Sequence, residues 1–394
     1  MNKFELLLPA GNFQKGQYAF EYGADAIYVG LKAYSLRARS SNFDFDELTE
    51  ITKYAHSLNK KIYVVLNIIC HNSHLRGFEA FFKKINKINV DGAIVADPYI
   101  FSKIKAINPN FSIHISTQQS ICNSKAAKFW KDNGASRIVV SREMCFNELK
   151  LMLKNLNNLI EIEYFIHGAV CISYSGRCMM SNNFSLRDAN VGGCAQSCRW
   201  NYQILDCDSK GKFFTMSAKD MCLIDDFKKL MTLNIASFKV EGRMRSLHYV
   251  STVAACYRYV IDNILNKIEY NKLFVRKEIQ KAENRLADKA WFDKIPNKNK
   301  MLYFEDKNSL KQLFAFVFKE KIDDKTYVII SKNFFTTSNK FELVLPNLKN
   351  ILFKINTIIE DDKYIDVVNK PMQEYVIKIS RKIPEWKNRV VRIV

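Results

Sequence analysis

Residues 91–117 read DGAIVADPYIFSKIKAINPNFSIHIST, and this stretch shows the pattern that decides the fold. Two short apolar runs, DGAIVAD and SIHIST, flank a segment that begins at Pro98 and is predicted to be helical. Apolar, β-branched runs that alternate with helices predict parallel strands joined by right-handed crossovers. The stretch therefore predicts one strand-helix-strand unit.

The same unit recurs along residues 1–265. The other predicted strands are FELLL (4–8), DAIYVG (25–30), KIYVVLNII (61–69), SRIVVS (136–141), EIEYFIHG (161–168) and IASFKVEG (235–242). Helices are predicted over residues 13–22, 44–58, 75–88 and 123–132. Pro9 and Gly11 predict a turn after the first strand. Eight strands in this length favour a closed (β/α)8 TIM-like barrel over an open doubly wound sheet. Neither the glycine fingerprint of dinucleotide-binding folds nor a P-loop motif follows any strand.

The composition changes after residue 265. Residues 266–307 are rich in lysine and predict a helical connector. Residues 308–394 contain short alternating runs, such as LFAFVFKE and EYVIKIS, which predict a small antiparallel β-barrel-like domain. This last segment has neither Cys nor His, so it is assigned no chemistry. Holding an RNA and packing on the barrel are both compatible with its sequence.

The composition of the 394-residue chain is that of an ordinary globular protein, with 48% hydrophobic and 25% charged residues. No signal peptide pattern precedes the first strand, and no run of 18 or more apolar residues occurs. The protein is therefore expected in the cytoplasm, without a membrane partner. In that reducing compartment, ten cysteines indicate metal or redox chemistry where they cluster.

The charge is strongly positive. Sixty Lys and Arg residues against forty Asp and Glu residues leave a formal net charge of +20. Such a field attracts polyanions, nucleic acids among them. A well-solvated, lysine-rich surface explains the same number, so the charge alone leaves both interpretations open.

Four cysteines cluster in the loop 163–200, where Cys171, Cys178, Cys194 and Cys198 have six, fifteen and three residues between neighbours. Four thiolates suit either tetrahedral zinc or a 4Fe-4S cluster. Structural zinc usually comes with two short CxxC pairs, whereas this loop has a single close pair, so the spacing favours the iron-sulfur cluster and leaves zinc open. Cys222 is a minor candidate to replace one of the four.

Polar residues follow almost every predicted strand. In a barrel of this kind, the active site gathers at the carboxyl ends of the strands. A helix cap or a loop hydrogen bond is the alternative for each residue singly. The residues at these strand ends are Asn67, His71, Asn72, Asp97, Ser116, Gln118, Ser141, Arg142, Glu143, His167, Glu241 and Arg243.

The run from Glu163 to Ser181 is similar to the signature of the collagenase-like peptidases, family thirty-two among peptidases of unknown catalytic type. Within that family, further motifs resemble the branch that forms 5-hydroxyuridine at the tRNA wobble position. They are LPAGN, YSLRARSSNF, NIICHN, IHISTQQS, KFWKDNG, VVSRE, HGAVC, YSGRC, RDANVGGC with CRWNY, and SFKVEGRMRS. The resemblance covers residues 1–265 and is loose over the C-terminal domain.

This resemblance implies a function and its cofactors. It implies a 4Fe-4S cluster on the four clustered cysteines, and oxygen-independent C5-hydroxylation of wobble uridine in the anticodon loop of tRNA. Prephenate is implied as the hydroxyl source, and a paralogous protein is a candidate partner subunit. A wobble base lies in a single-stranded loop, where it can be splayed out into a pocket.

The matching motifs also indicate site residues. Prephenate is a small dicarboxylate, and guanidinium groups grip carboxylates bidentately. The substrate-binding candidates are Arg37, Arg39, Asn67, His114, Gln118, Arg142, Arg177, Arg187, Arg199 and Arg243. The catalytic candidates are His167, Glu143 and Glu241.

Three other functions compete with this hypothesis. A collagenase-like peptidase would need a nucleophile or a metal, and the chain has neither the HExxH nor the GxSxG motif. Cys171 near His167 is weak evidence for a thiol protease, and a cluster ligand cannot also be a free nucleophile. Hydroxylation of ribosomal RNA or another ring substrate is the second alternative, and a non-catalytic RNA-binding cluster protein is the third.

Overall fold

The computed structural model describes residues 4–37, 41–203, 213–282, 285–297, 299, 302 and 313–394. The chain divides into two compact units. The first comprises Met1–Phe20, Ala24–Met244 and Arg285–Asn308, and the second comprises Glu21–Gly23, Arg245–Asn284 and Ser309–Val394. Each unit has its own sheet.

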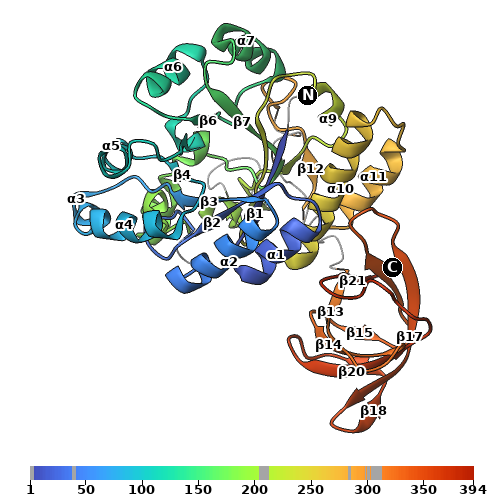
Figure 1. Ribbon diagram of the computed structural model, residues 1–394. Coiled ribbons are helices and arrows are strands. Elements are labelled where there is room, and N and C mark those ends of the chain that lie inside the picture. Colours follow the sequence, from blue (N-terminus) through green and yellow to red (C-terminus); the bar gives the residue numbers. More distant parts are fainter. Residues whose placement is uncertain are drawn as a thin grey trace. The chain divides into compact units, whose positions relative to one another are not determined.

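The first unit is a closed barrel of eight parallel strands, as far as the described residues extend (Figure 1). The strands are β1 (Glu5–Ala10), β2 (Ala26–Gly30), β3 (Lys61–Leu66), β4 (Gly92–Val95), β5 (Ile113–Ile115), β6 (Arg137–Val139), β7 (Glu161–Gly168) and β11 (Ser237–Val240). Each pairs with the next in chain order, and β11 pairs with both β7 and β1, which closes the ring. The predicted (β/α)8 TIM-like barrel is confirmed.

Amphipathic helices surround these strands (Figure 1). They are α1 (Phe13–Glu21), α2 (Phe45–Ser57), α4 (Phe78–Ile88), α5 (Pro98–Ile107), α6 (Ser124–Asp132) and α7 (Phe146–Leu156), with the short α3 (Asn72–Leu75) before α4 and the short α9 (Phe227–Leu230) before β11. Local sequence starts these helices. Asp97 caps α5 by accepting hydrogen bonds from the Tyr99 and Ile100 amides, and Pro98 takes the first helical position.

The turn predicted at Pro9 and Gly11 begins later than expected, because β1 continues through Ala10. Pro9 pairs with Tyr28 of β2, while the ladder to β11 ends at Leu7. The backbone N–H and C=O groups of successive residues in a strand point to opposite neighbouring strands. Pro9, which lacks an N–H, faces β11, and the ladder between β1 and β11 has already ended at Leu7. A proline is therefore tolerated inside this strand.

Buried charged side chains pair with one another in the interior of the barrel. Arg137 Nη1 lies 2.6 Å from Glu5 Oε1 and 3.2 Å from Glu163 Oε2, and Lys239 Nζ lies 2.6 Å from Glu163 Oε1. Glu163 is fully buried, and burial lowers the pKa of Lys239. Because each buried charge has an opposite partner, the desolvation cost is offset and the side chains are held in place.

Short elements follow β7 and β11 in the first unit. They are η2 (Tyr174–Gly176), α8 (Met180–Ser185), η3 (Ala189–Val191), η4 (Ser197–Arg199), β8 (Tyr202–Gln203), β9 (Phe213–Phe214), β10 (Asp220–Cys222) and β12 (Ala287–Asp288). β10 runs antiparallel to β7 and parallel to β12. In the described part of segment 266–307, predicted as a helical connector, there is thus a strand as well as a helix.

The second unit contains α10 (Leu247–Leu265), α11 (Lys272–Gln280) and a closed six-stranded antiparallel barrel, counted over the described residues. The barrel order is β16 (Lys340–Val344), β21 (Val390–Ile393), β13 (Phe314–Lys321), β14 (Thr326–Ser331), β20 (Glu374–Ile379) and β17 (Ile351–Glu360), with β17 closing on β16. β18 (Lys363–Ile365) extends β17, and β15 (Phe335–Thr336) pairs with β19 (Val367–Val368). The predicted β-barrel-like domain is confirmed, and Phe316, Phe341 and Phe353 lie in its core.

Across the described residues, none of the helices combines the length and apolar character that a membrane crossing requires.

The ion network inside the first barrel leads to a stability prediction. Arg137→Met leaves Glu5 without its buried cation and should lower the free energy of unfolding by about 3–5 kcal/mol. Lys128→Met removes a charge from the exposed pair with Asp132 and should cost less than about 1 kcal/mol. Urea denaturation of the full chain compares the two, and equal losses would contradict the proposed weight of the network.

Candidate functional site: a cavity beneath the cysteine loop

A cavity opens at the carboxyl ends of the barrel strands, where the polar strand ends were expected to meet. The empty space within it and at its mouth, open solvent included, is about 1200 Å³. The ends of β2, β3, β4, β5, β6, β7 and β11 line its floor and walls with Tyr28, Val65, Ile94, Ser116, Val139, Phe165 and Lys239. Lys239 belongs both to the interior ion network and to the cavity floor, where its ammonium group lies near the rings of Tyr28 and Phe165.

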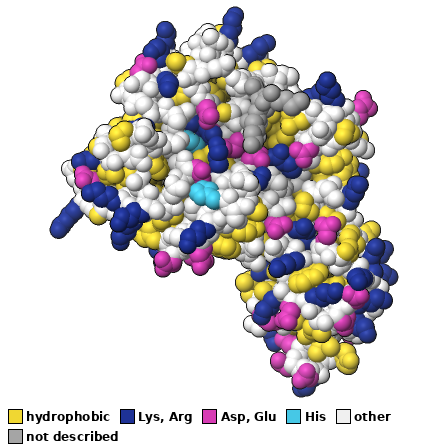
Figure 2. Space-filling view, viewed as in Figure 1, with side chains coloured by type: hydrophobic (Ala, Val, Ile, Leu, Met, Phe, Trp, Pro, Cys, Tyr) yellow, Lys and Arg dark blue, Asp and Glu magenta, His cyan; other side chains and the backbone are white. Residues whose placement is uncertain are grey.

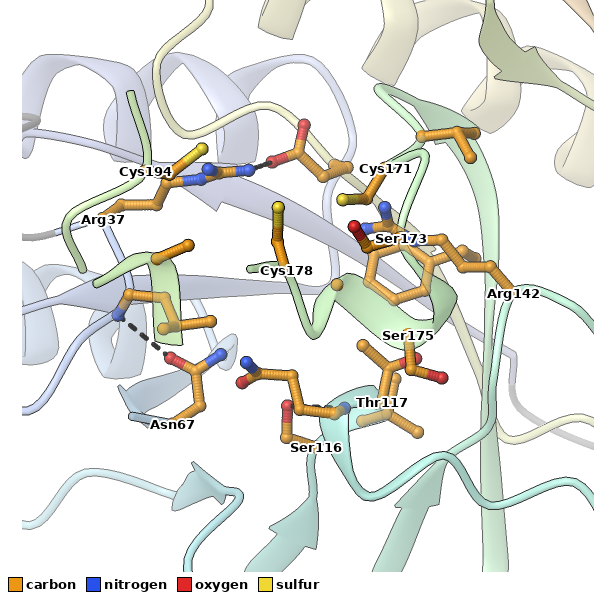
Figure 3. A pocket seen from close by; sticks show the side chains of 18 of the residues that line it. Arg37, Asn67, Ser116, Thr117, Arg142, Cys171, Ser173, Ser175, Cys178 and Cys194 are labelled. Carbon is orange, nitrogen blue, oxygen red and sulfur yellow. Dashed lines mark hydrogen bonds and ion pairs between the residues drawn. The ribbon is translucent and has the colours of Figure 1, made fainter. Parts of the chain in front are cut away.

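All four clustered cysteines line this cavity. Figure 3 shows the thiols of Cys171, Cys178 and Cys194 on one side of it. Burial raises the pKa of Cys171 and of Cys198, and in both cases the nearby thiols raise it further. In the described part of the chain, no three His, Cys, Asp or Glu side chains converge on one point that could hold a metal ion.

The cysteine loop has little regular structure and is held by polar contacts to three neighbouring loops. Glu143 Oε1 accepts a hydrogen bond of 2.7 Å from the Ser175 amide. Arg177 Nε donates to the Gln118 carbonyl at 2.7 Å, and the Ile69 amide donates to the Asn190 carbonyl at 3.0 Å. These contacts tie the loop to the ends of β6, β5 and β3.

Three of the predicted arginines line the cavity. Arg37 Nη2 lies 3.5 Å from Glu241 Oε1, as the dashed line in Figure 3 marks. Arg142 donates to the Ala169 carbonyl at 2.8 Å, and its guanidinium lies 3.9 Å from the centre of the Phe165 ring.

Arg243 is only 4% exposed, and burial lowers its pKa to about 10. Its Nη2 donates to Ser35 Oγ at 2.7 Å. Gly30, at the end of β2, leaves the space that this guanidinium needs, since a Cβ there would lie 1.6 Å from Arg243 Nη1. The sequence shows Gly30 only as the end of a strand.

The structure also places the other predicted site residues. Asn67, Gln118, Glu143 and Glu241 line the cavity, and Arg39 lies outside the described residues. Arg177 lines a separate hollow beside His71 and Asp188, and Arg187 is exposed. Arg199 donates to the Gln196 side chain, and Cys222 belongs to β10.

His114 and His167 are both buried but, of the described residues, neither is among those that line the cavity. His114 lies in the barrel interior, with its ring 4.5 Å from that of Tyr63 and its Nδ1 3.9 Å from Glu163 Oε2. In a regular strand, alternate side chains point to the same face, so His167 would point into the barrel together with Glu163 and Phe165. The register between β7 and β11 shifts just before His167, so the alternation is broken there.

Sequence reasoning missed Lys239, Tyr28, Phe165 and Ser175 as cavity residues. A signal existed for Lys239, because a lysine in the middle of the apolar run IASFKVEG is unusual for a buried strand. Ser175 lies within the YSGRC motif, but its place in the cavity wall depends on the path of the loop.

The fold and cavity define a TIM-like barrel protein with a cysteine-lined site at the mouth of the barrel. Comparison with known proteins gives the family. The family model "Peptidase family U32" matches residues 11–302, and "Peptidase family U32 C-terminal domain" matches residues 311–387. The chain therefore belongs to peptidase family U32.

Relatives of this chain carry different names. "tRNA hydroxylation protein P1" of Bacillus subtilis (strain 168) is 38% identical, over 97% of this chain and 93% of that protein. "23S rRNA 5-hydroxycytidine C2501 synthase" of Escherichia coli (strain K12) is 32% identical, over 68% of this chain and 40% of that protein. "Collagenase" of Porphyromonas gingivalis (strain ATCC BAA-308 / W83) is 30% identical, over 68% of this chain and 67% of that protein.

The contacts of Glu143 predict a local change in dynamics. Glu143→Ala removes the acceptor for the Ser175 amide and should speed hydrogen exchange of residues 173–177 by at least about tenfold. Glu143→Gln keeps one acceptor oxygen and should show a smaller effect. Exchange mass spectrometry of both variants checks this, and unchanged exchange in Glu143→Ala would show that the loop does not depend on the carboxylate.

Proposed function

We propose that this protein hydroxylates RNA, and specifically that it converts wobble uridine in tRNA to 5-hydroxyuridine without molecular oxygen. The observation that carries the proposal is the cavity itself, where four thiols, three arginines and Lys239 meet at the mouth of the barrel. The relatives named as RNA hydroxylation proteins support the reaction class.

The four cysteines are the proposed ligands of a 4Fe-4S cluster. In such a cluster each cysteine binds a separate iron, so the four thiols that line this cavity need not meet at one point. When bound, the cluster would supply redox chemistry beside the base. The donor set is soft, as this cofactor requires, and all four cysteines come from one loop.

The arginines are the proposed site for prephenate. Arg37, Arg142 and Arg243 line one cavity, and a dicarboxylate pairs well with guanidinium groups there. Lys239 adds a fourth cation at the floor. The side chains of Phe165 and Tyr28 bound the same space with apolar rings, which would exclude water from a bound ring substrate.

RNA binding is supported by the surface of the cysteine loop. Phe184 and Trp200 are 54% and 42% exposed, and Arg187 lies exposed near Phe184 in the chain. Unpaired bases stack on exposed aromatic rings and on guanidinium planes. Figure 2 shows Lys and Arg side chains spread over the visible face, which suits contact with phosphates.

A peptidase is less well supported by the site. A thiol nucleophile needs a lowered pKa, whereas burial raises the pKa of Cys171. His167, the nearest histidine in sequence, is not among the cavity-lining residues of the described chain.

Nucleoside analysis tests the proposed reaction. Deleting the gene should abolish 5-hydroxyuridine and its derivatives in tRNA, and re-expression of the wild-type chain should restore them. Re-expressed Arg243→Met should restore less than about a tenth, because its buried guanidinium faces the cavity. Unchanged tRNA with altered 23S rRNA would assign the activity to ribosomal RNA, and cleavage of gelatin with unchanged RNA would favour the peptidase.

Metal content tests the cofactor. Anaerobically purified protein should be brown, with about four irons per chain. Cys178→Ala should lose most of this iron, whereas Cys256→Ala, a buried cysteine of the second unit, should keep it. Colourless protein with one zinc per chain would refute the cluster.

A further inference from the structure

Gln118 is buried in the cavity wall with its side-chain amide unsatisfied. It is 2% exposed, and neither Oε1 nor Nε2 has a hydrogen-bond partner among the described residues. Its neighbour Gln119 contrasts with it, because Gln119 Nε2 donates to the Ala96 carbonyl. A buried amide with both ends unsatisfied is costly, so a bound partner that offers both a donor and an acceptor would stabilise it.

Asn67 places a second amide in the same wall. Its Oδ1 accepts a hydrogen bond of 3.3 Å from the Leu36 amide. That bond fixes the orientation of the Asn67 side chain and leaves the Nδ2 group as the end that donates. Asn67 points into the cavity in Figure 3, and both amides line it.

Asn67 lies across the cavity from two of the thiols. In Figure 3, Asn67 lies on one side together with Ser116 and Thr117, the residues that precede Gln118, and Cys171 and Cys178 lie on the other. A flat molecule bound between Asn67 and these thiols would present one edge to the amide wall and the opposite edge to the thiols.

We propose that Gln118 and Asn67 read the Watson–Crick edge of a uracil base, and so turn its C5 atom toward the cysteine loop. This inference rests on the proposed function. Uracil offers an N3–H donor flanked by two carbonyl acceptors. Gln118 Oε1 accepts from N3–H while Nε2 donates to a carbonyl, and Asn67 Nδ2 donates to a carbonyl. The C5–C6 edge of the ring then lies on the far side.

The fixed amide also gives a preference between pyrimidines. Gln118 can turn over and pair with cytosine, which presents an acceptor beside an amino donor. The Asn67 amide cannot turn over in this way, because its oxygen accepts the hydrogen bond from the Leu36 amide. Uracil has a carbonyl acceptor on each side of N3, whereas cytosine has a carbonyl on one side only. The Asn67 Nδ2 group can therefore donate to uracil on either side of N3, but to a carbonyl of cytosine on one side only.

Binding of RNA tests the proposal without turnover. The probes are anticodon stem-loops with uridine or 3-methyluridine at the wobble position, where the methyl group removes the N3–H donor. Wild-type protein should bind the uridine probe about 10- to 100-fold more tightly. Gln118→Ala removes the amide and leaves room for the methyl group, so the two Kd values should agree within about threefold.

Gln119→Ala is the matched control, because its amide is already satisfied by Ala96 and it lies outside the main cavity. It should keep the wild-type ratio. If Gln118→Ala does not fold, Gln118→Glu serves instead. Its two acceptor oxygens face a uracil carbonyl, so binding of the uridine probe should weaken at least tenfold. Iron content per chain verifies that the cysteine loop is intact in each variant.

Equal binding of both probes by wild-type protein would overturn the proposal, as would full discrimination by Gln118→Ala. The wild-type protein could discriminate between the two probes while 5-hydroxyuridine stays unchanged in the deletion strain. That result would support recognition of the Watson–Crick edge and reject the proposed hydroxylation. The two proposals therefore fail separately.

Discussion

The charged pairs of Lys239, Glu163 and Arg137 are the constraint on which the site depends. A barrel interior filled by aliphatic side chains would be packed and neutral up to its mouth. Here the buried carboxylate of Glu163 requires cations on two other strands, and these hold β6, β7 and β11 in fixed positions. The network stops at Lys239, above which the cavity opens.

The cysteine loop depends on the barrel in a different way. Its turns include Ser175, Leu186 and Gln196 at positive φ, a conformation that costs energy for residues other than glycine. Contacts from the rim offset this cost, most directly the carboxylate of Glu143 on Ser175. A predicted catalytic residue is thus also a support for the loop that brings the thiols over the cavity.

The family shows how one scaffold can carry different chemistry. Its members bear names as different as collagenase and RNA hydroxylation protein, so membership alone does not decide the reaction. The decision rests on side chains at the mouth of the barrel. Raised pKa values of Cys171 and Cys198 disfavour a thiol nucleophile, and the cationic wall of the cavity suits an anionic ligand.

The sequence by itself determined the eight strands, the closed barrel and the second β-barrel, because apolar alternation and helix caps are local properties. It also determined that the four cysteines follow the seventh strand. The residues of the cavity wall were only partly predictable. Arg37, Arg142 and Arg243 line it, whereas Arg177, Arg187, Arg199, His114 and His167 lie elsewhere among the described residues.

Tertiary structure decided these differences for physical reasons. His167 lies beside a register shift that no local pattern reveals, and His114 faces a charge network built from four other strands. Arg177 is turned to the Gln118 carbonyl by the path of a loop. Local sequence sets which element forms, but pairing register and loop path set which side chains meet.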